Sequence, residues 1–249
     1  MRDAFSRESL RSVSAGFLLP LASARSLRIT VLAAIAVTGV VATLRAIGLL
    51  TAESLDALRR AIPVVAVPIA AALLAELPIR EGLTQRTLLY PLLGPVSRGS
   101  LALGRTLWTV ALVALGALVA SAALFLMTAD RSGDWGRECL AIVLGACAYV
   151  ALFGLLHLVS QRGLVSALAL YFLVDQPLAQ LPFSIRVLAP SFHVGSLLGR
   201  SPSYQLPIQV DTVSVAPVVS ALVLLAVSSL AIGWTMRLFS RRDLPELCG

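Results

Sequence analysis

Apolar residues are concentrated in six long segments of the chain, separated by shorter polar stretches. About 20 apolar residues wound as a helix cross the roughly 30 Å hydrocarbon core of a bilayer. The six segments lie near Ile29–Leu50, Ala61–Ile79, Thr106–Ala129, Cys139–Ser160, Gly163–Phe183 and Val213–Phe239. Because lipid cannot pair with backbone N–H and C=O groups, each segment is predicted to be helical. The predicted fold class is all-α, a polytopic membrane protein with six transmembrane helices.

Composition agrees with this prediction. Of the 249 residues, 58% are hydrophobic and 13% are charged, and the mean hydropathy is +0.89. A soluble domain of this size is about a quarter charged, so a soluble globular enzyme is excluded. The sequence contains no evident internal repeat or low-complexity tract, and residues 1–249 are interpreted as a single transmembrane domain.

Residues 1–27 have a different pattern, because they are more polar and carry several arginines. Leu10, Val13, Phe17 and Leu21 recur at helical spacing, with polar residues between them. Such a pattern is typical of an amphipathic helix lying in the membrane interface. An unstructured tail is the alternative. The segment is too long and too polar to be the first region of a signal peptide.

All 20 basic residues are arginine, and the formal net charge is +7. The arginines divide unequally between the two sets of connections, 13 on one side and 6 on the other, with Arg45 near the end of the first segment. The larger set contains Arg2, Arg7, Arg11, Arg25, Arg28, Arg80, Arg86, Arg98, Arg105, Arg162, Arg237, Arg241 and Arg242. The positive-inside rule places this set, and both termini, in the cytoplasm. The charge is therefore interpreted as a topology signal, and no nucleic-acid partner is expected.

The chain contains no lysine and no asparagine. A Walker A loop needs lysine to contact the β- and γ-phosphates of ATP, so this chain cannot hydrolyse ATP by that route. Lysine Schiff-base chemistry is excluded for the same reason. Together with abundant alanine, leucine and arginine, this composition suggests a bacterial protein, and hence the bacterial inner membrane.

The connections between the apolar segments differ in length. Those at 51–60 and 130–138 are short and leave no room for an outer domain. The connection at 184–212 is longer and is expected to hold one or two short helices lying at the outer surface. The cytoplasmic stretch at 80–105 is patterned: Thr84–Tyr90 can form two helical turns, which Pro91 ends. A short cytoplasmic helix joined to two membrane helices can transmit force from a soluble partner.

This stretch resembles the first cytoplasmic loop of type-2 ABC transporter permeases, which export drugs, lipids and polysaccharides. The residues that match the family pattern are Glu81, Gly82, Thr84, Leu88, Leu89, Pro95, Ser97, Arg98 and Gly104. Arg105 stands where the family usually has lysine, and Leu83 separates Gly82 from Thr84. The run from Leu188 to His193 is similar to a segment found after the fifth span of these permeases.

The resemblance implies a membrane subunit that forms a dimer with a second permease copy or homologue. A separate ATPase subunit, which would hold ATP and magnesium, would bind each half from the cytoplasm; no cofactor is expected on this chain. The coupling residues would be Arg80, Glu81, Gly82, Thr84, Arg86, Leu88 and Leu89. Glu81 and Arg86 would be the polar contacts with the ATPase, although solvated charges that set topology are the alternative.

Two polar residues lie inside predicted spans. Asp175 interrupts the fifth segment together with Pro177 and Pro182, and a carboxylate within a membrane is costly and often functional. Alternatively, Pro177 and Pro182 mark an early end of the helix, and Asp175 then lies near the outer interface, where it caps a helix or is hydrated. His157 is one candidate partner for Asp175, although a single histidine on an apolar helix is usually a hydrogen-bonded core residue.

A metal site is not expected, because two histidines without an H-E-x-x-H spacing provide too few ligands. The alternative function is an intramembrane metalloprotease of the CAAX-processing type. Glu76-x-x-x-Arg80 and Phe153-x-x-x-His157 match that family in part, but Ala75 replaces one glutamate and no asparagine is available for its third motif. A membrane scaffold without transport activity is a further alternative.

Overall fold

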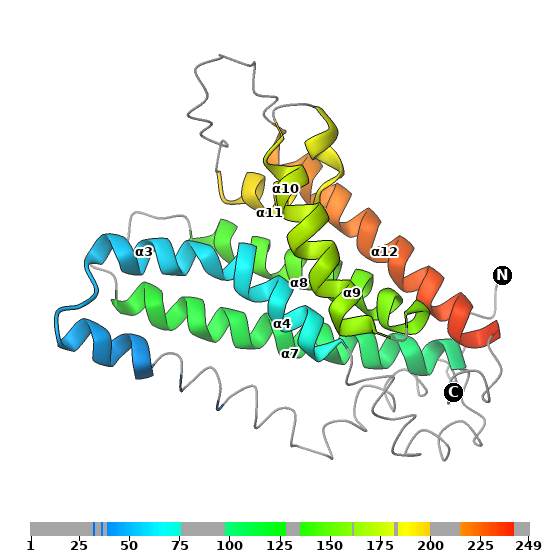
Figure 1. The fold of residues 1–249 in the computed structure, drawn as a ribbon, viewed down its shortest axis with the longest axis horizontal. Coiled ribbons are helices and arrows are strands. Elements are labelled where there is room, and N and C mark those ends of the chain that lie inside the picture. Colours follow the sequence, from blue (N-terminus) through cyan, green and yellow to red (C-terminus); the bar gives the residue numbers. More distant parts are fainter. Residues whose placement is uncertain are drawn as a thin grey trace.

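The computed structural model describes Leu32, Ala36 and residues 39–75, 98–127, 135–160, 162–181, 184–199 and 215–241. Every regular element in these residues is a helix (Figure 1). The predicted all-α class is therefore confirmed for this part of the chain. The N-terminal interfacial helix at 1–27 and most of the coupling loop at 80–105 lie outside the described residues.

Four helical stretches are long and apolar enough to cross a membrane: Ala52–Leu74, Arg98–Met127, Trp135–Val159 and Pro217–Ser240. The first consists of α3 (Ala52–Ala61), η2 (Ile62–Ala66) and α4 (Val67–Leu74). The next two are α7 (Arg98–Met127) and α8 (Trp135–Val159), and the last lies within α12 (Pro217–Arg241). A shorter apolar stretch, Gly163–Ala179, corresponds to the predicted fifth span. Of the predicted first span, residues 39–46 form a continuous helix.

The predicted outer loop at 51–60 is wrong, because these residues form α3. Thr51 caps this helix, and the side chains of Thr51 and Ser54 each accept a hydrogen bond from the other residue's backbone N–H. A loop was predicted here because the segment contains the charged residues Asp56, Arg59 and Arg60. In the structure they pair with one another, so the helix continues into the apolar part. The predicted loop at 130–138 also ends early, because α8 begins at Trp135.

Prolines shape the stretch from α3 to α4. Proline has no backbone N–H, so Pro68 cannot donate to the carbonyl of Val64 one turn earlier. The chain here forms the π-helical segment η2, in which the N–H of Val67 bonds to the carbonyl of Ile62. The hydroxyl of Tyr171 donates to the Val64 carbonyl at 2.6 Å. A side chain from the fifth apolar segment thus replaces the missing helical donor.

A second π-helical segment, η4 (Leu170–Asp175), lies between α9 (Gly163–Ala169) and α10 (Gln176–Ala179). The N–H of Gln176 bonds to the carbonyl of Tyr171, and the helix continues past Pro177 to Ala179. The expected interruption at Asp175 therefore does not end the helix. The wider π turn accommodates the proline instead.

The core is centred on α8, which packs against α4, α7, α11 and α12. About 61% of its apolar window is buried, against 28% for α7 and for α12. Ala141, Ala146 and Ala148 have no exposed surface. A Cβ added to Gly145 would contact the side chains of Val194 and Val67 at 3.4 and 3.9 Å. Small residues therefore let the neighbouring backbones approach this helix closely.

The described part of the connection after the fifth apolar stretch, residues 184–199, contains two short helices, η5 (Ser184–Leu188) and α11 (Pro190–Leu197). The prediction of one or two short helices is confirmed. Of the two, α11 packs between α8 and α12 with His193 and Val194 fully buried, and its position at the outer membrane surface stays a prediction. Because it is mainly apolar, this helix is more stable inside the bundle than on its surface.

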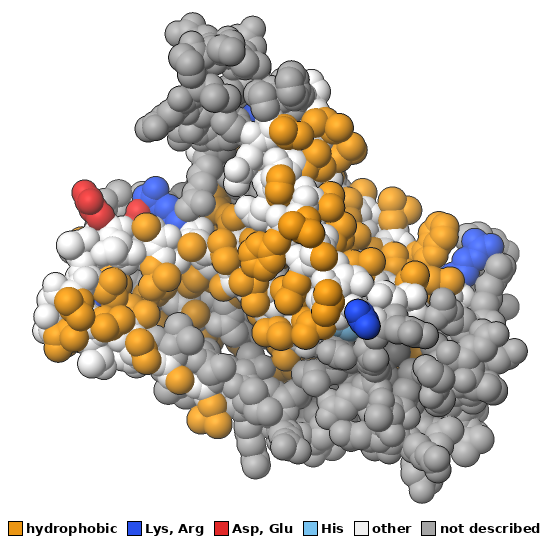
Figure 2. All heavy atoms as spheres, in the orientation of Figure 1, with side chains coloured by type: hydrophobic (Ala, Val, Ile, Leu, Met, Phe, Trp, Pro, Cys, Tyr) orange, Lys and Arg blue, Asp and Glu red, His pale blue; other side chains and the backbone are white. Residues whose placement is uncertain are grey.

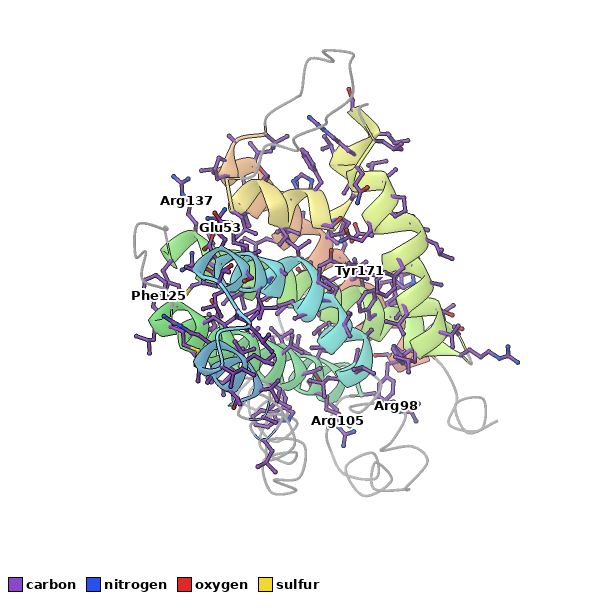
Figure 3. All side chains as sticks on the ribbon, turned by 60° about the vertical axis from the view of Figure 1, so that its left-hand side comes forward. Glu53, Arg98, Arg105, Phe125, Arg137 and Tyr171 are labelled. Atoms are coloured by element: carbon purple, nitrogen blue, oxygen red, sulfur yellow. The ribbon has the colours of Figure 1, made fainter. Side chains whose placement is uncertain are left out.

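Charged and apolar side chains are separated over the molecule. Apolar side chains cover much of the face seen in Figure 2, and many of them are large and exposed. Figure 3 shows Glu53 and Arg137 near one end of the bundle and Arg98 and Arg105 at the other. An apolar belt between two charged ends is the pattern expected of a multi-pass membrane protein.

Candidate functional site

The most distinctive polar group inside the bundle is the carboxylate of Asp175, whose residue is 6% exposed. Its Oδ2 accepts a hydrogen bond from the hydroxyl of Tyr149 at 2.6 Å, and its Oδ1 accepts one from the backbone N–H of Ser191 at 3.2 Å. The Ser191 hydroxyl donates to the main-chain carbonyl of Asp175, also at 3.2 Å. Asp175 therefore connects η4 with α8 and α11.

Neither sequence interpretation of Asp175 described this arrangement in full. Asp175 makes no side-chain cap bond to α10, but it accepts the Ser191 N–H in the first turn of α11, so the capping interpretation holds for that neighbouring helix. Its burial is inconsistent with hydration at an interface. Among the described residues, no arginine or histidine forms an ion pair with it. Its partners are a hydroxyl and a backbone amide, which sequence reasoning missed because they come from distant segments.

His157 is not the partner of Asp175. It lies more than two turns beyond Tyr149 along α8, about 12 Å away by helical rise. Its Nδ1 is 2.7 Å from the carbonyl oxygen of Phe153, while its Nε2 is buried without a hydrogen-bond partner. The ring is packed against Gly163, where an added Cβ would come within 2.5 Å of the His157 Cδ2 atom.

Three aromatic rings surround the Asp175 side of the bundle. Tyr149 and Phe153 follow one another on α8, with ring centroids 5.6 Å apart, and Tyr171 meets Tyr149 edge-on at 6.0 Å. The Tyr171 hydroxyl, besides donating to Val64, accepts a hydrogen bond from the side-chain amide of Gln176 at 2.9 Å. Figure 3 places Tyr171 between the two charged ends of the bundle.

A cavity of about 120 Å³ borders these groups. Tyr149, Phe153, Tyr171 and Asp175 all contribute to its wall, and the remaining lining is apolar. The site therefore combines a buried carboxylate, aromatic rings and a small cavity that reaches the outer surface of the bundle at Val174 and Leu188. Sequence reasoning selected Asp175 but not the aromatic residues. The spacing of Tyr149 and Phe153, one helical turn apart, was the available signal.

A second polar cluster lies where α3, α7 and α8 meet. The guanidinium of Arg59 contacts Asp56 at 3.0 Å and Glu138 at 3.4 Å, and it lies over the ring of Phe125 at 5.2 Å. The hydroxyl of Ser121 donates to the other oxygen of Glu138 at 2.5 Å. Both Arg59 and Glu138 are buried. The cluster holds three helices together. It was missed from the sequence because Arg59 and Glu138 were both assigned to loops.

His193 connects the two short helices to α12. Its Nε2 donates to the carbonyl of Val187 at 2.7 Å and its Nδ1 accepts from the hydroxyl of Ser220 at 3.2 Å, an assignment that requires the neutral ring. Burial lowers the pKa of His193 below its usual value, while the hydrogen bond to Val187 opposes this shift. The sequence had selected this residue only as the end of a family-like segment.

The predicted coupling residues and Glu76 lie outside the described residues. The coupling residues are Arg80, Glu81, Gly82, Thr84, Arg86, Leu88 and Leu89. Of the same loop, Arg98 and Arg105 are in the first turns of α7. In the described ranges, no three histidine, cysteine or acidic side chains are grouped as metal ligands. The two histidines are also far apart. His193 is next to Val194, which packs near Gly145 of α8, and His157 lies about 18 Å from Gly145 along that helix.

Comparisons with known proteins give no match to a family model, a curated protein or a solved structure.

Proposed function

We propose that this chain is the membrane-spanning subunit of an ATP-driven ABC exporter in the bacterial inner membrane. It would cross the membrane six times, with both termini in the cytoplasm, and form the translocation path as a dimer. A separate ATPase subunit would bind the coupling residues at 80–89 and supply the energy. The resemblance of two segments to type-2 permeases suggests this function.

The observation that carries the proposal is the fold of the segment from Leu188 to His193. In the sequence, this run resembles the segment that follows the fifth span of type-2 permeases. In the structure it lies at the start of α11, which returns into the bundle and packs on α8 and α12. The position of α11, between the fifth apolar stretch and the last long helix, agrees with the plan of that family.

The geometry of α7 supports a coupling role for the preceding loop. This helix is continuous for 30 residues from Arg98, so a displacement of the loop at 80–97 would be transmitted along it. Near its start, a Cβ added to Gly99 would lie 3.3 Å from the Ser240 Oγ and 3.5 Å from the Met236 Cε of α12. Movement of α7 would therefore also displace α12, which is the last long helix.

The mechanism we infer is a population shift between two membrane conformations. ATP-driven closure of the ATPase pair would push the helices at Arg80–Tyr90, and the spans would rock between inward- and outward-facing states. The path for the substrate would lie between the two protomers. A ligand or nucleotide shifts this equilibrium only through its different affinity for the two states.

The test is reconstitution with the ABC ATPase encoded beside the gene for this chain. We expect the two proteins to purify as a stable complex and the complex in liposomes to hydrolyse ATP faster than the ATPase alone. Failure of the ATPase to bind, with the membrane subunit folded and inserted, would contradict the proposal. On the described residues nothing favours the proteolytic alternative, since His157 and His193 are too far apart to bind one metal ion.

A further inference from the structure

Two arginines lie close to each other at the end of the bundle where α7 begins and α12 ends. A Cβ added to Gly99 would lie 3.5 Å from the Cε atom and 3.8 Å from the Cβ atom of Met236. The two helix ends are therefore adjacent, as Figure 1 also shows. Arg98 precedes Gly99 in the sequence and Arg237 follows Met236. We call Arg98 and Arg237 the arginine patch.

The acidic residues that the structure describes lie away from this patch. They are Glu53, Asp56, Glu138 and Asp175. Asp56 and Glu138 both contact Arg59, which lies over the ring of Phe125, about 40 Å further along α7 than Arg98 by helical rise. Figure 3 shows Glu53 at that same far end, and Asp175 is buried against the start of α11. Among the described charges, the complement of the arginine patch is an anion supplied from outside the chain.

The exposed face of α12 has three layers that lead to the patch. Val219 and Leu230 are 48% and 74% exposed, Trp234 is 63% exposed, and Arg237 is exposed one turn later. The order along the helix is aliphatic carbon, indole and guanidinium. A bilayer presents hydrocarbon, interface and phosphate in the same order. Five turns separate Val219 from Arg237, about 27 Å by helical rise, which is close to the thickness of the hydrocarbon core.

The neighbours of Arg237 distinguish between kinds of anion. A soluble anion or an acidic protein surface would match the guanidinium but not the exposed indole of Trp234 and the exposed side chain of Leu230. A phospholipid matches all three, because its phosphate and its fatty chains belong to one molecule. Tryptophan is enriched at the level of the lipid headgroups, and guanidinium forms bidentate hydrogen bonds with phosphate.

Helix electrostatics explain only one of the two arginines. Arg237 lies near the end of α12, where a cation interacts favourably with the helix dipole. Arg98 is the first residue of α7, where the dipole is already positive and a cation is unfavourable. A phosphate beside both helix ends would offset this repulsion at Arg98 and would add a partner for Arg237.

We propose that the arginine patch, together with Trp234, binds the headgroup of an anionic phospholipid such as phosphatidylglycerol. The phosphate contacts Arg98 and Arg237, and the fatty chains lie along the exposed face of α12. The proposal requires that the chain lies in a membrane, but it depends neither on ATP nor on export. A lipid-binding measurement on the purified chain therefore tests it separately from the proposed function.

The first experiment compares dioleoyl phosphatidylglycerol with dioleoyl phosphatidylcholine, which have the same fatty chains. Each lipid is titrated into the full chain, purified and delipidated in a neutral detergent, and bound lipid is counted by native mass spectrometry. Because each arginine near the membrane surface contributes about fivefold to the affinity for anionic lipid, we expect phosphatidylglycerol to bind at least about fivefold more tightly. Raising the salt concentration from about 0.1 M to about 1 M should reduce this preference. Equal affinity for the two lipids, or a preference that salt does not change, would overturn the proposal.

The second experiment uses matched variants. Arg237→Gln and Arg98→Gln are each expected to weaken phosphatidylglycerol binding about fivefold and to leave phosphatidylcholine binding unchanged. The control is Arg60→Gln, because Arg60 has a 55% exposed side chain and is next to Arg59 at the far end of α7. It should bind both lipids as the wild type does.

Thermal unfolding of each variant verifies that it is folded, and the exposed Arg237 decides the test if Arg98→Gln does not fold. Wild-type preference for phosphatidylglycerol in Arg237→Gln, or an equal loss in Arg60→Gln, would overturn the proposal. Loss of ATPase association by Arg237→Gln without any change in lipid preference would assign the patch to a protein partner, and would overturn it as well.

Discussion

The hydroxyl of Tyr171 lies 2.6 Å from the carbonyl oxygen of Val64 and donates a hydrogen bond to it across 107 residues of sequence. The two residues belong to η4 and η2, the two π-helical segments of the described chain. The bond exists because Pro68 cannot provide the backbone donor that Val64 would normally have.

Replacement of Tyr171 by phenylalanine should therefore destabilise the protein by about 1–3 kcal/mol, because a buried carbonyl loses its partner. In a Pro68→Ala background the alanine N–H is available to Val64, and the same replacement should cost less. The free energy of unfolding in mixed micelles, measured for the wild type, both single variants and the double variant, checks this. Additive effects would indicate that Tyr171 and Pro68 act independently.

The buried pair of Arg59 and Glu138 should be more important for stability than the neighbouring surface pair. Arg59→Ala leaves Glu138 buried without its cationic partner and should cost about 3–5 kcal/mol of unfolding free energy. Arg60→Ala removes a partner of Asp56 whose side chain is 55% exposed, and should cost about 1 kcal/mol or less. The same unfolding measurement compares them, and similar losses for the two variants would contradict this assignment.

His193 should make stability decrease at acidic pH. Burial lowers its pKa in the folded state, so the unfolded state binds the proton more readily. The stabilising contribution is complete above the unfolded pKa of about 6.5 and decreases as the pH falls below it. We expect the difference in Tm between the wild type and His193→Gln to become smaller between about pH 7 and pH 5. A pH-independent difference would show that the imidazole does not titrate as described.

Two glycines should respond in opposite ways to alanine. At Gly163 a Cβ would meet His157 atoms at 2.5–2.8 Å, one of them Cα, and such overpacking costs about 1–3 kcal/mol. At Gly154, inside α8, nothing lies within 4 Å of the added Cβ, and alanine should stabilise the helix by up to about 1 kcal/mol. Thermal unfolding of both variants measures this, and a stable Gly163→Ala protein would argue against the close packing of α8 and α9.

The coupling proposal predicts that charge reversal at Glu81 impairs coupling to the ATPase, whereas charge reversal at Glu53 does not. Glu81→Arg should decrease ATPase association and stimulation without affecting membrane insertion. Glu53→Arg is the matched control, because Glu53 is exposed in the first turn of α3 at the end opposite Arg98 and Arg105 (Figure 3). Normal coupling by the Glu81 variant, or equal loss in both, would show that the ATPase contact lies elsewhere.

The long helices were the easiest elements to predict, because α7, α8 and α12 each contain a continuous apolar run that fits a bilayer. The α3 segment was missed, since a sequence pattern does not show that Asp56, Arg59 and Arg60 neutralise one another. The early helix end expected at Pro177 and Pro182 agrees with the structure in part, because the helix passes Pro177 and ends at Ala179, before Pro182. A π turn keeps the helix continuous, and such a turn depends on neighbouring contacts rather than on local preference.

The candidate site could be predicted only in part. Asp175 was conspicuous because a carboxylate is rare within an apolar segment. Its partners were not accessible to the same reasoning, because Tyr149 and Ser191 reach it through the packing of α8 and α11, and tyrosine and serine are common in apolar helices. The coupling residues at 80–89 were proposed from family resemblance, and they stay a prediction.

The bond between Tyr171 and Val64 also has a consequence for biogenesis. Val64 and Pro68 are synthesised 107 and 103 residues before Tyr171, respectively. At about 5–20 residues per second, this separation corresponds to roughly 5–20 s of translation. During that interval the Tyr171 hydroxyl is not available to the Val64 carbonyl, so in a nascent chain shorter than the fifth apolar stretch this polar group lacks the donor that it has in the folded protein. That group is hydrogen-bonded as in the mature protein only after the distant tyrosine has entered the membrane.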